Sequence, residues 1–445
     1  MKLIPILTLS LILFLTCCAR AQTFHNIYDF SGDTVGKGPF MQLVPGPGNM
    51  LYGETYNGVG SSFGTVFAVK MDGTGFTNLL SFNYTDGGFP EGGLILSSNT
   101  LYGTATEGAN GEGTVFAVNT DGTGFTNLYS FSGPDGSDPQ ANLILSGNTL
   151  YGTTAGGGSN DYGVVFTINT DSTGFTNLHN CNIPGAANPE SGLILSGNTL
   201  YGASYGGGTN SEGAVFSLQT DGTHFANLFN FHGYDGYFPV GSLVLSGSTL
   251  YGTTIQGGTS HGNVYAINTD GSGFTNLYTF SGNKDGSYPM AGLVLSGHTL
   301  YGTASAGGSN NWGCVFSINT NGTSFAHLYD FTNGLDGGAP GAALLLFSNT
   351  LYSTTLHGGT NSDGTIFSIT LPPSSAPPAM TIHISTTNLV VAWPSTATGY
   401  TLMSSTNLAS PSGASVVTST PSVVNGLYTV TNPIVGQQMF YYLSK

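Results

Sequence analysis

Short runs of alternating apolar and polar residues, separated by segments rich in Gly, Ser and Asn, fill most of the chain. Over residues 125–170 the order is FTNLYSF, a Gly/Asp/Pro loop, NLILS, TLYGTT, a Gly/Ser/Asn loop and GVVFTIN. Each run is rich in β-branched and aromatic residues, is bounded by turn-forming residues and lacks helical periodicity. The pattern predicts four β-strands in this segment.

The four-strand pattern recurs seven times, with a spacing of 49 to 51 residues. Each copy contains a Leu-Tyr pair, a proline followed four residues later by leucine, and an aromatic residue after Val or Ile. The leucines of the pairs are Leu51, Leu101, Leu150, Leu200, Leu250, Leu300 and Leu351. A β-helix would need shorter coils, and a string of separate domains would need larger units. We therefore expect an all-β fold, a seven-bladed β-propeller of four-stranded repeats over residues 22–371.

We name the strands of one repeat A (NLILS), B (TLYGTT), C (GVVFTIN) and D (FTNLYSF). The A–B turns contain Ser-Gly-Asn and the C–D turns contain Thr-Asp-Gly, both typical of tight hairpins. The chain starts with a D-type run, FHNIYDF, and the seventh repeat ends with a C-type run near Leu371. We expect residues 24–30 to supply the missing strand D of the last blade, because closing the ring removes exposed sheet edges.

The chain changes character after the seventh repeat. Residues 372–380 are rich in Pro and Ser and are typical of a linker. Residues 381–445 leave the 50-residue register, and TIHIST, LVVAWPS, GYTLMSS, LYTVT and MFYYLS indicate about five strands. We expect a small β-sandwich-like domain with Trp393 in its core.

The N-terminus has the pattern of an export signal. Lys2 precedes an apolar run at residues 3–15, and Ala19-Arg20-Ala21 provides small residues for cleavage after Ala21. The run is too short to remain as a membrane-spanning helix. Lipidation of Cys17 or Cys18 is the alternative, and it is less favoured because neither follows a small residue. We expect residues 1–21 to be removed and the mature chain to be secreted or held at the cell surface, without a transmembrane segment.

Charge and cysteine content exclude several classes of partner. After removal of residues 1–21, four lysines and no arginine remain against 22 Asp and Glu, a net charge of −18. Nucleic acids and anionic membranes need a basic surface, so we expect neither as a partner. Cys181 and Cys314 are too far apart in the repeats to pair readily and stand at apolar positions. We expect both to be free and buried.

The elements LYGTT, GG, GxVF, DGT and FTNLYSF recur in this order over residues 24–371. They resemble the GloVer tandem repeat of the choice-of-anchor family, found in exported bacterial proteins with differing C-terminal anchor or sorting segments. Residues 381–445 resemble a small C-terminal β-module common on such proteins. The resemblance implies export and a repeat domain, and it supplies no assigned activity and no catalytic residues. The sequence departs from the pattern at Ser353, in place of Gly, and at Cys181, in place of Phe.

Strand direction predicts where a ligand would bind. In an antiparallel blade the A–B and C–D turns lie at one end, and the longer B–C and D–A loops lie at the other. The residue before the glycine that opens strand C is aromatic, His or acidic in every copy. These candidate ligand-binding residues are Phe63, Glu112, Tyr162, Glu212, His261, Trp312 and Asp363. Rings stack on sugars and carboxylates accept hydroxyl hydrogens, so the set favours a glycan, while packing of the blade ends is the plainer interpretation.

The first functional hypothesis is a secreted or surface-attached binding or scaffolding protein without catalytic residues. Its partner would be an extracellular glycan or a cell-surface protein. The second is a carbohydrate-active enzyme, a glycoside hydrolase or lyase, with Glu112 and Glu212 as acid and base across the central channel. A purely structural surface protein is the third. No motif of a hydrolase or metalloprotease is present, and we expect no cofactor.

Two patterns bear on metal binding. The Asp-Gly pairs of the D–A loops could suggest calcium, but one Asp per blade does not supply six converging oxygens, so turn formation is favoured. These aspartates are Asp86, Asp135, Asp235, Asp285 and Asp336. The histidines fall at different positions of the repeat, which argues against a histidine cluster. We expect no metal site.

Overall fold

The computed structural model describes residues 22–32, 34–59, 63–258 and 260–372, and the strands of the C-terminal part within 381–384, 388–394, 401–405, 415–417, 421–424, 427–433 and 440–444. The chain divides into two compact units, one of them Gln22–Thr370 and the other containing Leu371–Lys445. The expected signal peptide at 1–21 and most of the expected linker at 372–380 lie outside the described residues.

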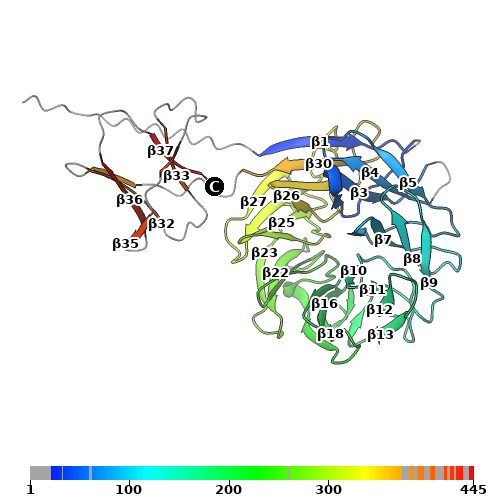
Figure 1. Ribbon diagram of the computed structural model, residues 1–445. Helices are drawn as coiled ribbons and strands as arrows, with labels where there is room; N and C mark the ends of the chain where they lie inside the picture. The colour runs from blue at the N-terminus through cyan, green and yellow to red at the C-terminus, as the bar shows by residue number, and fades with distance from the viewer. Residues whose placement is uncertain are drawn as a thin grey trace, which may run out of the picture. The chain divides into compact units, whose positions relative to one another are not determined.

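The first unit is a seven-bladed β-propeller, in which four-stranded antiparallel sheets are arranged around a common axis (Figure 1). Blade 1 contains β2 (Val44–Gly46), β3 (Met50–Thr55), β4 (Thr65–Lys70) and β5 (Thr77–Ser81), and blade 2 contains β6 (Ile95–Ser97), β7 (Thr100–Ala105), β8 (Thr114–Asn119) and β9 (Thr126–Ser130). Blade 3 contains β10 (Ile144–Ser146), β11 (Thr149–Thr154), β12 (Val164–Asn169) and β13 (Thr176–Asn180). Blade 4 contains β15 (Ile194–Ser196), β16 (Thr199–Ser204), β18 (Ala214–Gln219) and β19 (Ala226–Asn230).

Blade 5 contains β20 (Val244–Ser246), β21 (Thr249–Thr254), β22 (Asn263–Asn268) and β23 (Thr275–Thr279), and blade 6 contains β24 (Val294–Ser296), β25 (Thr299–Ala304), β26 (Cys314–Asn319) and β27 (Ala326–Asp330). Blade 7 contains β28 (Leu345–Phe347), β29 (Thr350–Thr355) and β30 (Thr365–Thr370), with β1 (Thr23–Asp29) as its fourth strand. Two 3-10 turns, η1 (Pro47–Asn49) and η2 (Gly233–Asp235), and the short pair β14 (Ala186–Ala187) and β17 (Gly206–Gly207) lie between these strands.

The ring closes with a strand from the opposite end of the unit, as the phase of the repeats predicts. β1 runs antiparallel to β30, with register pairs from Thr23↔Thr370 to Asp29↔Thr365. After the strand, the Phe30 N–H donates to the Gly364 carbonyl oxygen at 3.0 Å. The seven expected sheets and the closing strand are therefore both confirmed.

The repeated apolar positions form the core between blades. The leucine of each Leu-Tyr pair and the aromatic residue of each strand C are completely buried. At six of the seven boundaries, the Phe that ends strand D meets the strand C ring of the next blade edge-on, with centroids 5.0–5.3 Å apart. Cys181 stands at the seventh boundary, and both it and Cys314 are free and buried, as expected.

The outermost strands are joined by stacked rings. The tyrosine of FTNLYSF, or the ring in its place, stacks on the first Phe of the next blade's strand D, with centroids 3.7–4.3 Å apart. Six boundaries contain such a pair, and Leu80 replaces the ring at the boundary of blades 1 and 2. Aromatic pairs of this kind contribute about 0.5–1.5 kcal/mol beyond their buried area.

The residue before the proline of each D–A loop links two neighbouring blades. The Phe89 N–H donates to the Phe63 carbonyl oxygen of blade 1, and the Phe89 carbonyl oxygen accepts from the Thr106 N–H of blade 2. The same two bonds recur at every boundary, and the linking residue always has a φ of 52 to 69°. The other linking residues are Gly38, Asp138, Asn188, Phe238, Tyr288 and Ala339. Each D–A loop is therefore fixed to the blades on both sides.

The glycine that opens strand C explains why the glycine and proline positions recur together. Gly113 has a φ of +100°, and a Cβ added there would lie 2.3 Å from Pro139 Cδ and 2.8 Å from the Ala105 carbonyl oxygen. The equivalent glycines of the other blades make the same close approach to the next proline. Only glycine combines this φ with this contact.

The C-terminal unit is also all-β. One sheet has the order β31 (Thr381–Ile384), β32 (Asn388–Pro394), β36 (Leu427–Pro433) and β35 (Ser422–Val424), and the other has β34 (Ser415–Val416), β33 (Thr401–Ser405) and β37 (Phe440–Ser444). Trp393 is 1% exposed and packs with Val391, Val430 and Leu402, which come from both sheets. The arrangement is that of a small sandwich with Trp393 in its core. The described residues of this unit form seven strands where about five were expected, because β34 and β35 are too short to recognise in the sequence.

No helix in the described part of the chain is long and apolar enough to cross a membrane.

Candidate functional site

The long loops of all blades lie at one end of the ring. Adjacent strands in every blade are antiparallel, so the B–C and D–A loops leave the sheets on the same side. Backbone bridges also join each D–A loop to the B–C loop of the next blade, as in the pairs Gly88↔Glu107 and Ser137↔Gly156. We call this end the long-loop face, and the end with the A–B and C–D hairpins the turn face.

The seven residues expected to bind ligand occupy equivalent positions around the long-loop face, one per blade, and do not converge on one pocket. Their carbonyl oxygens accept the inter-blade hydrogen bonds described above. This set comprises Phe63, Glu112, Tyr162, Glu212, His261, Trp312 and Asp363.

Most of these side chains contact their own loops. Phe63 lies edge-on to Tyr84 and Phe89, with centroids 5.5 Å apart in each pair. The carboxylates of Glu212 and Asp363 accept backbone N–H groups at 2.7 and 2.8 Å. Packing of the blade ends thus accounts for the positions of these three side chains. The His261 ring and the Glu112 carboxyl also lie against glycines of the loops.

Tyr162 and Trp312 differ from the rest of this set because they are exposed. Tyr162 is 36% exposed and Trp312 is 39% exposed, where the other five are at least partly buried. Trp312 has one ring neighbour, His357, edge-on at 6.5 Å. These two rings are free to contact a ligand.

Exposed large apolar side chains are concentrated on the long-loop face. Seven of the eight in the described residues belong to its loops, and only Phe347 belongs to the turn face. The seven are Tyr84, Tyr162, Ile183, Tyr234, Met290, Trp312 and Leu335. Nearly all of the exposed large apolar side chains among the described residues therefore lie at one end of the ring.

A group of carboxylates lies near the axis on the same face. Glu91 and Glu190 follow the prolines of blades 2 and 4, in the segments that lead to the innermost strands. Burial raises the pKa of each to about 7, with a further increase from Asp138. The pKa of Asp138 is itself raised by burial and by Glu107. We call Glu91, Glu107, Asp138 and Glu190 the acidic arc.

The remaining positions around the axis are apolar or neutral. Blades 5 and 6 place Val240 and the exposed Met290 where the acidic arc has Glu91 and Glu190. Further along the segments that lead to the innermost strands, the Asn142 side chain of blade 3 donates to the Gln42 side chain of blade 1 at 3.3 Å. Among the residues that follow the D–A prolines, the carboxylates thus belong to blades 2 and 4 and the apolar side chains to other blades.

The acidic arc was not recognised in the sequence. Its glutamates occur in only two of the seven repeats, and the Glu after proline at both places is the one available signal. The pair suggested instead, Glu112 and Glu212, lies against the first residues after the outermost strands, beside Gly133 and Gly233. These carboxyls do not face each other across the axis.

The Asp-Gly pairs form turns, as expected. Asp135 accepts hydrogen bonds from the Ser132 N–H and hydroxyl and from the Tyr129 hydroxyl. Asp285 and Asp336 make the same contacts in their blades.

One further carboxyl is buried inside blade 1. Glu54 is 1% exposed, and neither of its oxygens has a hydrogen-bond partner among the described residues. Its strand B position holds Thr in most blades, and Thr253, for example, donates to the Ala291 carbonyl oxygen of the next blade at 3.0 Å. Burial raises the pKa of Glu54 to about 8, against the opposing effect of the Gly93 backbone N–H. The Glu54 carboxyl is therefore mostly protonated and uncharged below that pH.

The model of the Gloeobacter/Verrucomicrobia repeat matches residues 95–263 and 249–419, well over half of the chain. The chain belongs to the Gloeobacter/Verrucomicrobia repeat family. The resemblance inferred from LYGTT, GxVF and FTNLYSF is thereby confirmed, and each of the two matches spans several blades.

Several solved structures are similar to this repeat protein at low sequence identity. An oligogalacturonate lyase in complex with manganese is 11% identical with a TM-score of 0.50, over 80% of this chain and 97% of the lyase chain. A chain of the nidogen/laminin complex is 16% identical with a TM-score of 0.41, over 62% and 92%. A gluconolactonase from Xanthomonas campestris is 13% identical with a TM-score of 0.36, over 58% and 79%. No curated protein sequence matches the chain significantly.

Proposed function

We propose that this protein is an exported, non-catalytic binding protein that holds a glycan on its long-loop face. The observation that carries the proposal is the one-sided distribution of exposed apolar and aromatic side chains. Rings that are partly exposed and partly supported by loops suit the apolar faces of sugars, and nearby carboxylates accept hydroxyl hydrogens. The export signal expected from the sequence of residues 1–21 supports an extracellular location.

The charge of the face restricts the class of glycan. The described long-loop face carries the acidic arc, and the whole chain has only six Lys and Arg against 22 Asp and Glu. A uronate or sulfated polymer would be repelled by this arrangement. Neutral hexose polymers and amino sugars are the ligands that fit it.

The experiment is a glycan array followed by calorimetry on the protein without residues 1–21. Trp312→Ala combined with Tyr162→Ala should weaken binding of the selected glycan by at least roughly fivefold, because each stacked ring that is lost contributes about 1 kcal/mol. Phe347→Ala is the matched control, since this ring is 38% exposed on the turn face. It should leave the affinity unchanged.

Three results would decide against the proposal. The array could show no glycan above background, the double variant could bind as well as the parent protein, or Phe347→Ala could weaken binding equally. A double variant that fails to fold, judged by circular dichroism, would show that Tyr162 and Trp312 are packing residues.

A carbohydrate-active enzyme is the second candidate, and the observation in its favour is the acidic arc. Two carboxyls with a pKa of about 7 could exchange protons near neutral pH, as a general acid or base must. Glu91→Gln and Glu190→Gln distinguish the two functions. An enzyme would lose turnover of the bound glycan with little loss of affinity, whereas a binding protein shows no turnover to lose.

A further inference from the structure

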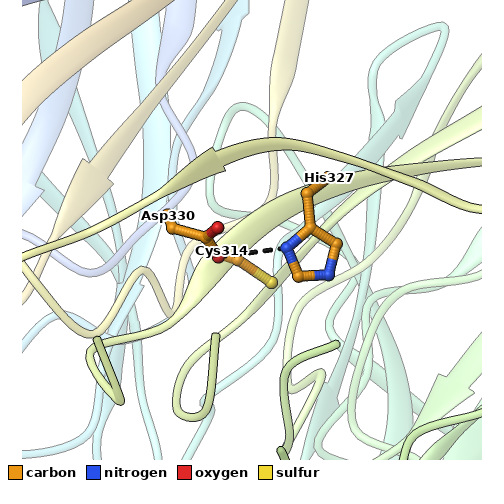
Figure 2. A group of neighbouring side chains, drawn as sticks. All are labelled: Cys314, His327 and Asp330. Carbon is orange, nitrogen blue, oxygen red and sulfur yellow. Dashed lines mark hydrogen bonds and ion pairs between the residues drawn. The ribbon is translucent and has the colours of Figure 1, made fainter. Parts of the chain in front are cut away.

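Three side chains of different chemistry meet in blade 6 at the long-loop end of strands β26 and β27 (Figure 2). The donor atoms of Cys314, His327 and Asp330 all lie within 4.8 Å of one another. Cys314 is directly opposite Asp330 in the strand register, and His327 is opposite Phe316. His327 Nδ1 lies 3.0 Å from Asp330 Oδ1.

The other blades provide internal controls for this arrangement. All six carry Asn at the position of His327, and none carries Cys at the position of Cys314. In blade 7 the same three positions hold Asn26, Asp29 and Thr365, and the Asn26 amide donates to Asp29 Oδ1 at 2.7 Å. Asn127 with Ser130 in blade 2 and Asn227 with Asn230 in blade 4 form the same pair, so an i, i+3 side-chain hydrogen bond along strand D recurs in the repeat. Blade 6 alone replaces it with nitrogen and sulfur ligands, and both replacements occur together.

The geometry is close to that of a tetrahedral metal site. Zinc lies about 2.3 Å from a cysteine sulfur and about 2.0–2.1 Å from a histidine nitrogen, which places the two ligand atoms roughly 3.5 Å apart. The observed donor atoms lie within 4.8 Å of one another, so bringing them to about 3.5 Å requires shifts of no more than about 1 Å. The Asp285 carbonyl oxygen lies 3.8 Å from Cys314 Sγ, close enough to serve as a fourth ligand.

The neighbourhood also holds the carboxylate in place. The Ser309 hydroxyl donates to Asp330 Oδ2 at 3.0 Å, and the Ser309 N–H donates to Oδ1 at 3.3 Å. Hydrogen bonds of this kind orient the ligands of metal sites. A divalent cation with one thiolate and one carboxylate gives a site of zero net charge, which suits a partly buried position.

We propose that Cys314 Sγ, His327 Nδ1 and a carboxylate oxygen of Asp330 bind a divalent metal ion of the zinc type, with the Asp285 carbonyl oxygen or water as fourth ligand. This site is separate from the proposed glycan site and does not depend on it. It revises the expectation of no metal site, which weighed the Asp-Gly turns and the scattered histidines separately.

Binding must release one proton. Burial, together with Asp330 and Asp285, raises the pKa of Cys314, so the metal-free thiol is protonated. The metal displaces the thiol proton to solvent. The proton on His327 Nδ1 moves to Nε2, which leaves a neutral imidazole whose Nδ1 lone pair faces the ion.

The experiment is a titration of the reduced, chelator-treated protein with Co²⁺. One equivalent should produce a sulfur-to-cobalt charge-transfer band and the visible bands of tetrahedral Co²⁺, and Zn²⁺ should displace both. Cys314→Thr and His327→Asn restore the residues of other blades, so both should keep the fold. Cys314→Thr should abolish the charge-transfer band, and His327→Asn should weaken binding by more than the roughly 10–100-fold typical of an outer-shell partner.

Cys181→Ser is the matched control, because Cys181 is the other buried free thiol of the propeller. It should leave the titration unchanged, and Ser309→Ala should weaken binding by about 10–100-fold. The proposal is overturned if one equivalent of Co²⁺ gives no charge-transfer band, if the band survives in Cys314→Thr, or if Cys181→Ser removes it. Circular dichroism of each variant shows that a lost band does not result from unfolding.

Discussion

Replacement of Phe30 by Ala tests whether the closing strand belongs to the cooperative unit of the propeller. Phe30 is completely buried, and its ring lies 5.3 Å from Tyr28 and Phe67 and 5.9 Å from Phe76. Truncation of a fully buried Phe to Ala removes about 3–5 kcal/mol from the free energy of unfolding. We expect a loss in this range, because closure makes the N-terminal strand part of the core.

Phe131 supplies a matched control in a blade whose strands are continuous in the chain. It is equally buried, with rings at 5.2, 5.3 and 5.9 Å, and its N–H donates to Gly113 at 3.0 Å, as the Phe30 N–H donates to Gly364. Guanidinium unfolding of Phe30→Ala and Phe131→Ala should give similar losses with unchanged m-values. The reasoning fails if Phe131→Ala loses 3–5 kcal/mol, as expected for a buried Phe, and Phe30→Ala loses under about 1 kcal/mol. Such a result would mean that β1 detaches before the ring unfolds.

The remaining predictions concern closure, backbone strain and pH. Deletion of residues 22–31 should expose the edge of β30 and cause association in size-exclusion chromatography, and a stable monomer would contradict the closure. Gly113→Ala should destabilise the fold by about 1–3 kcal/mol more than Gly147→Ala. Both glycines have a positive φ, but a Cβ at Gly147 would meet no atom within 4 Å, whereas a Cβ at Gly113 would meet Pro139. Equal losses of stability in thermal unfolding would refute the contact with Pro139. The pKa of Glu54 is raised on folding. The contribution of its protonated carboxyl to the stability of the fold is therefore fully present below about pH 4.5 and is lost as pH rises to about 8. The free energy of unfolding of Glu54→Thr, relative to that of the parent protein, should therefore rise by up to roughly 4 kcal/mol between pH 5 and pH 8. A difference in unfolding free energy that does not change with pH would disprove a buried carboxyl with a raised pKa.

The fold could be predicted because each blade repeats the same physical solution. Buried leucines and rings at fixed spacings predict the strands, and the excess D-type run at the N-terminus predicts the closing strand. The pairing of glycine and proline positions was visible in the sequence, but its reason was not. It depends on contact between the strand C of one blade and the loop before the next, as between Gly113 and Pro139.

The sites were harder to predict because they depend on departures from the repeat. Glu91 and Glu190 lie 99 positions apart in the sequence and come together only because the ring brings blades 2 and 4 to the same axis. Each strand D contains a bulge that shifts its register against strand C, and in blade 6 the shift falls between the pairs Val315↔Tyr329 and Phe316↔His327. Counting back from the hairpin without this shift would misplace Asp330 relative to Cys314. The sequence contains no sign of the bulge.

The pairing of β1 with β30 has a consequence for how the ring could be opened. Thr23 and Thr370 are register partners, so the chain enters and leaves the propeller at one point of its rim. A short linker between Gln22 and Leu371 would therefore make the ring covalently continuous without disturbing a strand. New ends could then be placed in a hairpin of another blade, such as the exposed turn at Gly147. Such circular permutants would move the point of attachment around the rim while every blade keeps its four strands, and any blade could become the composite one.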